Sequence, residues 1–105
     1  MEAPNLNYIK NLCGEDQDFE NKIIEIIKKE LPEERKTYER FVFGDNYKDT
    51  AEIVHKLKHK ISILGLEKSY GIAVDFEKNL LNESKVLQKE FEKILTSMTN
   101  FINLL

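Results

Sequence analysis

Two histidines and three lysines fall within the six-residue segment HKLKHK at positions 55–60. A neutral imidazole nitrogen is a nucleophile near neutral pH and can also bind a metal ion. His55 and His59 are four residues apart, so on a helix their side chains share one side. Lys58 follows one turn after His55, where its aliphatic stem can pack while its ammonium reaches back toward the imidazole. This arrangement suits an anion beside His55.

A metal site is the alternative chemistry, because Glu52, His55 and His59 give E-x-x-H and H-x-x-x-H spacings on one helix. A di-iron bundle needs a second E-x-x-H helix and further inward glutamates, and the sequence contains no third histidine. The three side chains are also expected to point outward. Metal binding is therefore the weaker of the two interpretations.

The segments that must position these residues are predicted to be helices. Only four glycines and two prolines interrupt the 105 residues, and the segments between them are rich in residues that favour helices. Apolar spacing predicts helices over residues 3–14, from 16 to a turn at 43–46, over 47–64, over 66–81, and from about 85 to the terminus. We expect an all-α fold: an antiparallel four-helix bundle with a short additional N-terminal helix, forming one domain over residues 1–105.

Individual positions refine this expectation. Pro32 should either kink the second helix or begin a new one, and the apolar stripe continuing through Tyr38 and Val42 favours a kink. Gly65 is the expected C-terminal residue of the third helix, because glycine adopts the left-handed closing conformation without a side-chain penalty. Cys13 is expected to pack inertly at the end of the first helix. The predicted apolar stripes include Leu12, Phe19, Ile26, Tyr70 and Val86.

Charge and hydropathy exclude several classes of protein. The net charge is −3 and the isoelectric point is near 5.4, which argues against binding to nucleic acid. The apolar runs are too short to span a bilayer, and no secretory signal region is visible at the N-terminus. We therefore expect a cytoplasmic protein that does not bind membranes. There is no glycine-rich nucleotide loop, so autokinase activity is excluded.

Steps of about 100° per residue around the third helix show on which side His55 lies. Glu52, His59 and Ser62 share its side of that helix. The predicted core stripe lies elsewhere around the axis and comprises Ile53, Val54, Leu57, Ile61 and Leu64. His55 should therefore face solvent.

The segment HKLKHKISILG resembles the signature of histidine-containing phosphotransfer (HPt) domains, which is His-x-Leu-Lys with a glycine ten residues after the histidine. The matching positions are His55, Leu57, Lys58 and Gly65. The segment EDQDFENKIIEIIKKELPEE is similar to the second helix of the family with its proline, and Ala73, Phe76 and Glu77 fit a small residue followed by an apolar–Glu pair. The resemblance covers nearly the whole chain.

The resemblance implies a phosphorelay intermediate. His55 would accept a phosphoryl group on Nε2 from an aspartyl phosphate of a receiver domain and pass it to another receiver aspartate. Lys58 would stabilise the phosphate charge, while Lys56, His59 and Ser62 would contact the partner. The implied partners are response-regulator receiver domains and a hybrid sensor histidine kinase. The chain would act as a monomer without a cofactor of its own, and magnesium would be bound by the receiver.

The sequence departs from the family pattern beside the histidine. His59 stands where glycine is common, and Lys60 and Ile61 are bulkier than the usual residues. His59 could crowd a receiver or, when protonated, add a positive group near the phosphate. Partner choice would then be narrower, the domain would be weakened, or the bundle would bind receivers without phosphotransfer. Apart from the resemblance, Lys56 and Lys60 are interpreted as part of a solvated helix face.

Overall fold

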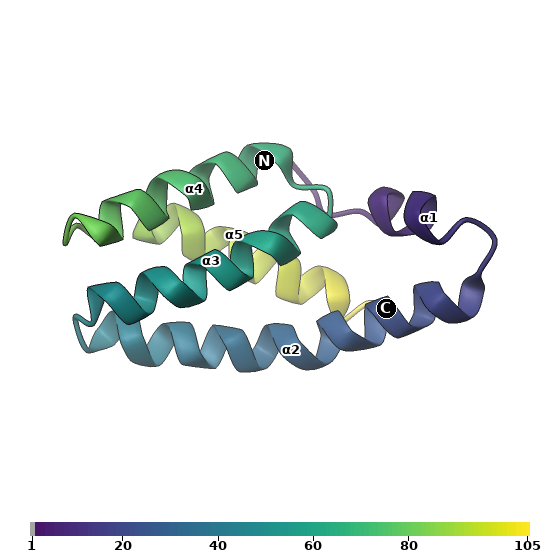
Figure 1. The fold of residues 1–105 in the computed structure, drawn as a ribbon, viewed down its shortest axis with the longest axis horizontal. Helices are drawn as coiled ribbons and strands as arrows, with labels where there is room; N and C mark the ends of the chain where they lie inside the picture. The colour runs from purple at the N-terminus through teal and green to yellow at the C-terminus, as the bar shows by residue number, and fades with distance from the viewer. Residues whose placement is uncertain (1) are drawn as a thin grey trace.

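The computed structural model describes residues 2–105, and all regular secondary structure in that range is helical. A short helix precedes four longer ones (Figure 1). Their bounds are α1 Asn7–Cys13, α2 Gln17–Phe43, α3 Tyr47–Ile63, α4 Glu67–Leu81 and α5 Gln88–Ile102. The predicted all-α class and the short N-terminal helix are confirmed.

The four long helices pack around a shared interior. Helix α3 contacts α2 on one side and α4 on the other, and α5 contacts both α4 and α2. Figure 1 shows the chain reversing direction at each connection between the long helices, with α1 beside the first turns of α2. The molecule measures 45 × 23 × 19 Å. Within residues 2–105 no helix is both long enough and apolar enough to cross a membrane.

Side-chain caps lie at the starts of α2 and α3. The Asp16 carboxylate accepts a hydrogen bond from the Phe19 amide at 3.0 Å, and the Asn46 side chain accepts one from the Asp49 amide at 3.4 Å. These bonds satisfy amides in the first turn that have no partner within the helix. Helix α2 therefore begins within one residue of the predicted start.

Helix α2 runs through Pro32 without interruption for 27 residues. Proline lacks an amide hydrogen, so the carbonyl oxygen one turn earlier loses its helical donor. The Pro32 ring lies on the exposed side of α2, where water can bind that carbonyl oxygen. Pro32 therefore does not begin a new helix, and the alternative of two separate helices is wrong.

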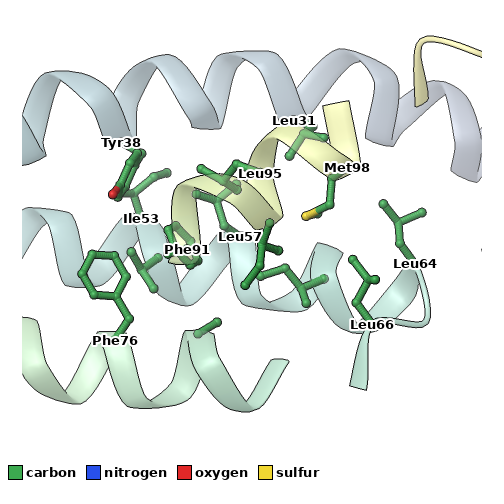
Figure 2. Packing of buried hydrophobic residues seen from close by; sticks show 14 of the residues in the cluster. Leu31, Tyr38, Ile53, Leu57, Leu64, Leu66, Phe76, Phe91, Leu95 and Met98 are labelled. Atoms are coloured by element: carbon green, nitrogen blue, oxygen red, sulfur yellow. The ribbon is translucent and has the colours of Figure 1, made fainter. Parts of the chain in front are cut away.

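Buried side chains from all four long helices meet in the interior (Figure 2). The rings of Tyr38, Phe76 and Phe91 lie 5.0–6.4 Å apart, and the Tyr38 hydroxyl donates to Glu92 at 2.9 Å. Cys13 is buried, as predicted. The predicted core stripe of α3 is also confirmed, since each member is at most 7% exposed: Ile53, Val54, Leu57, Ile61 and Leu64.

Five apolar side chains assigned to the apolar stripes are exposed instead, by 36–64%: Leu12, Phe19, Ile26, Tyr70 and Val86. Phe19 and Ile26 lie in the first turns of α2, where the seven-residue α1 covers only part of the surface. Val86 lies in the connection before α5 and not in the helix. Periodicity identified the apolar side of each element, but burial also needs a neighbour that covers the residue.

The N-terminal segment crosses the connection between α3 and α4 (Figure 1). The Asn5 amide donates to the Leu64 carbonyl oxygen at 2.8 Å, and the Glu2 carboxylate accepts a hydrogen bond from the Ser69 amide in the first turn of α4. The N-cap residue of α4 is Leu66, whose side chain cannot cap. Glu2 therefore supplies a capping interaction from a distant part of the chain.

Candidate functional site

His55 lies near the middle of α3 on its outer side. Its side chain is 54% exposed, whereas the neighbouring core residues Val54 and Leu57 are fully buried. The prediction that His55 faces solvent is therefore confirmed. Its imidazole is accessible to a reaction partner while α3 is held by the core beneath it.

A carboxylate from the next helix contacts the imidazole. Glu77 of α4 places Oε2 3.2 Å from His55 Nδ1 and Oε1 3.0 Å from Lys58 Nζ. The Glu77 side chain is only 20% exposed, so both interactions are partly shielded from water. Glu77 thus joins the histidine and the lysine of the HKLK segment through one side chain.

The prediction that the Lys58 ammonium reaches back toward the His55 imidazole is wrong. Its side chain is 13% exposed, and its ammonium binds Glu77 and lies 5.8 Å from the centre of the Tyr70 ring. Position 58 is three residues after His55 and therefore about 60° away around the helix, toward α4. The nearest carboxylate on α4 attracts the ammonium more strongly than a neutral imidazole can.

The Glu77 contact selects one tautomer of the neutral imidazole. An ionised carboxylate only accepts hydrogen bonds, so Nδ1 must carry the hydrogen that is donated to Glu77. The lone pair then lies on Nε2, which no protein group within residues 2–105 hydrogen-bonds. The half-exposed ring therefore presents Nε2 as a nucleophile or as a metal ligand.

The residues predicted to contact a partner are exposed on the same helix as His55. Lys56, His59 and Ser62 are exposed, and the centres of the His59 and His55 rings are 5.2 Å apart, with the ring planes nearly perpendicular at 87°. A shallow depression of about 420 Å³ adjoins His55 and Glu77. Its other lining residues are Lys48, Ala51, Glu52, Lys56 and Leu81. The site is open on this side.

Lys60 is not part of the solvated face that the sequence suggested. It is 8% exposed as a residue, and its ammonium lies 3.0 Å from both Glu30 and Glu34 of α2. Five residues beyond His55 correspond to about 140° around the helix, which turns Lys60 toward α2. Its charge is therefore neutralised away from the His55 site.

Gly65 closes α3, as predicted, with a φ of +77°. A Cβ atom at this position would lie 2.6 Å from the amide nitrogen of the Asn5 side chain. Glycine is required for both reasons, since a side chain would strain the backbone and displace Asn5. The turn at Gly65 sets where α4 begins and therefore where Glu77 lies.

The metal alternative finds no support in the arrangement of potential ligands. Among residues 2–105, no group of three or more His, Cys, Asp or Glu side chains is arranged to hold a metal ion. Glu52, His55 and His59 share one side of α3 but do not form such a group. His55 instead directs Nδ1 to Glu77.

Glu77 was not among the predicted site residues. It is 22 residues from His55 and lies on another helix, so spacing within the HKLKHK segment could not indicate it. The sequence signal was the apolar–Glu pair at Phe76 and Glu77, which the HPt resemblance included without a role for the carboxylate. Phe76 is fully buried, and it fixes the side of α4 from which Glu77 projects.

Searches against protein-family models, curated proteins and solved structures found no match to the chain.

Proposed function

We propose that the protein is a histidine phosphotransfer intermediate, with His55 as the phosphoryl acceptor. The observation that carries the proposal is the exposed imidazole whose Nδ1 contacts Glu77 at 3.2 Å, which leaves Nε2 free. The resemblance of the HKLK segment and Gly65 to HPt domains supports the same function. We interpret the four long helices as the antiparallel four-helix bundle of that family.

The reaction begins with attack of the Nε2 lone pair on the phosphorus of an aspartyl phosphate. A bond forms between Nε2 and phosphorus, the bond between phosphorus and the aspartate oxygen breaks, and the aspartate leaves with that electron pair as a carboxylate. The ring becomes positively charged with its hydrogen still on Nδ1. Glu77 holds the required tautomer and stabilises this charge through the Nδ1 hydrogen bond. Transfer to the next aspartate reverses the steps.

Lys58 acts on this reaction through Glu77. Its ammonium, 3.0 Å from Oε1, holds the carboxylate in place beside the imidazole. Direct contact with a phosphoryl group would require the Lys58 side chain to leave Glu77. Lys58 is therefore a positioning residue in the resting protein.

The proposed partners are receiver domains of response regulators and of a hybrid sensor histidine kinase, in the cytoplasm. A receiver would contribute the aspartyl phosphate, its bound magnesium and most of the catalytic groups. Lys56, Ser62 and His59 would lie at the contact surface, since all three are exposed around His55. The protein would supply the nucleophile and the groups that orient it.

The test is transfer of labelled phosphate from phosphorylated receivers to the purified chain. We expect label that is stable in alkali and labile in acid, as phosphohistidine is, and complete loss of this label in His55→Gln. The matched control is His59→Gln, which replaces the only other histidine in the sequence. It should still be labelled, because it retains His55. Receiver binding without label on the native chain would instead identify a bundle that binds receivers without phosphotransfer, which the bulk of His59 beside His55 would explain.

A further inference from the structure

A phosphoryl group on Nε2 of His55 carries negative charge and needs a positive or hydrogen-bonding neighbour. Two of the three lysines in the HKLKHK segment are engaged elsewhere. The Lys58 ammonium binds Glu77, and the Lys60 ammonium binds Glu30 and Glu34, with side-chain exposures of 13% and 10%. Use of either lysine would break an ion pair that is partly shielded from solvent.

His59 is free of such competition. Its side chain is exposed, and its ring centre lies 5.2 Å from that of His55. In the described part of the chain, the His59 side chain makes no hydrogen bond or ion pair. One helical turn separates the two residues, so both rings project from the same side of α3. An N–H of the His59 ring is therefore available to a group bound to its neighbour.

We propose that His59 binds the phosphoryl group on His55 and stabilises it during transfer, the role that the resemblance gave to Lys58. This inference rests on the proposed function. Neutral His59 donates one hydrogen bond, and protonated His59 adds a full positive charge. Charge spread over the phosphoryl oxygens in the transition state makes that positive charge most effective during transfer.

The charged groups of the neighbouring elements are paired with one another. On α3, His55 and Glu52 share the side of His59, and Lys56 is exposed. Glu77, the carboxylate that α4 brings to His55, is paired with Lys58, and the α2 carboxylates Glu30 and Glu34 are paired with Lys60.

The experiment measures single-turnover transfer from a phosphorylated receiver over a range of receiver concentrations. Three chains are compared: native, His59→Gln and His59→Lys. We expect the native chain to transfer about three- to fivefold faster than His59→Gln at saturating receiver. His59→Lys should transfer at least as fast as the native chain, because lysine supplies a positive charge at this position.

Each outcome decides the question. Equal maximal rates in native and His59→Gln, with no gain from lysine, overturn the inference and leave the proposed function standing. A change confined to the receiver concentration that gives half the maximal rate overturns it as well, because His59 would then affect docking alone. Failure of the native chain to accept any label overturns both the proposed function and this inference.

Discussion

Lys58 and Lys60 stand two residues apart in one basic segment, yet they belong to different regions of the molecule. Lys58 turns toward α4 and shares Glu77 with an exposed histidine. Lys60 turns toward α2 and binds Glu30 and Glu34. The comparison shows that the side of the helix, and not the residue type, decides whether a lysine binds the α4 carboxylate beside His55 or the two α2 carboxylates.

The two regions also differ in how open they are. The α4 side ends in a half-exposed imidazole beside a surface depression. On the α2 side, Glu34 is 17% exposed and its Oε1 is buried without a hydrogen-bond partner among the described residues. Lys60 is therefore the principal compensation for a carboxylate that is largely removed from water. The α2 side is structural, and the α4 side can take part in chemistry.

Replacement of Lys60 should have the largest effect on stability. Lys60→Met leaves the Glu34 carboxylate without its cation, and we expect the free energy of unfolding to fall by about 2–3 kcal/mol, measured by urea denaturation. The control is Lys60→Met with Glu34→Gln, which should recover part of the loss because the unpaired charge is gone. A loss below about 0.5 kcal/mol would place Lys60 among ordinary surface lysines and remove the contrast with Lys58.

The next effect is on transfer. Glu77→Gln keeps an oxygen that can accept from Nδ1 but removes the charge that stabilises the ring during attack. We expect phosphoryl acceptance at saturating receiver to slow about tenfold, with His55 still the labelled residue. Glu34→Gln is the matched control on the other side of α3 and should leave the rate unchanged. Equal slowing by both changes would indicate a general effect on α3.

Replacement of Lys58 should cost less stability than replacement of Lys60. In Lys58→Met, Glu77 retains its contact with His55 and is near enough to solvent to be hydrated, so we expect a loss of about 1 kcal/mol in the free energy of unfolding. Transfer should slow more than receiver binding weakens, because Lys58 holds the carboxylate beside the imidazole. Equal effects on transfer and binding would assign Lys58 to docking alone.

The smallest stability change is expected for His55 itself. His55→Gln removes an exposed ring whose protein contacts are Glu77 and His59, so the free energy of unfolding should stay within about 0.5 kcal/mol of the native value. Thermal denaturation followed by circular dichroism measures this directly. A loss as large as that of Lys60→Met would mean that the α4 side is also a structural ion cluster.

Sequence reasoning reached the outline of the site because periodicity reports which side of a helix is buried. The burial of Leu57 and the exposure of His55 both follow from steps of 100° along α3, and the closing role of Gly65 follows from its backbone freedom. The same steps turn Lys60 away from His55. The assignment of Lys60 to a solvated face was wrong because it relied on the charge of lysine and ignored the position of residue 60 around the helix axis.

The partners of these side chains lay beyond sequence reasoning. Glu77 and Glu34 come from helices on opposite sides of α3, and apolar spacing carries no information about which carboxylate meets which lysine. The exposure of Phe19 and Ile26 could not be predicted either, because it depends on how little of α2 a seven-residue helix covers. Both gaps concern contacts between elements and not the elements themselves.

The N-terminal segment gives the site a dependence on residues that lie outside the four long helices. Asn5 holds the end of α3 through Leu64, and Glu2 holds the first turn of α4 through Ser69. Helix α4 carries Glu77 about two turns beyond Ser69. If the segment detaches, the first turn of α4 loses this cap and can fray, which loosens the carboxylate that orients His55. The hydrogen bonds of residues 2–5 and the contact that orients the His55 imidazole are therefore linked through α4, although about fifty residues of sequence separate them.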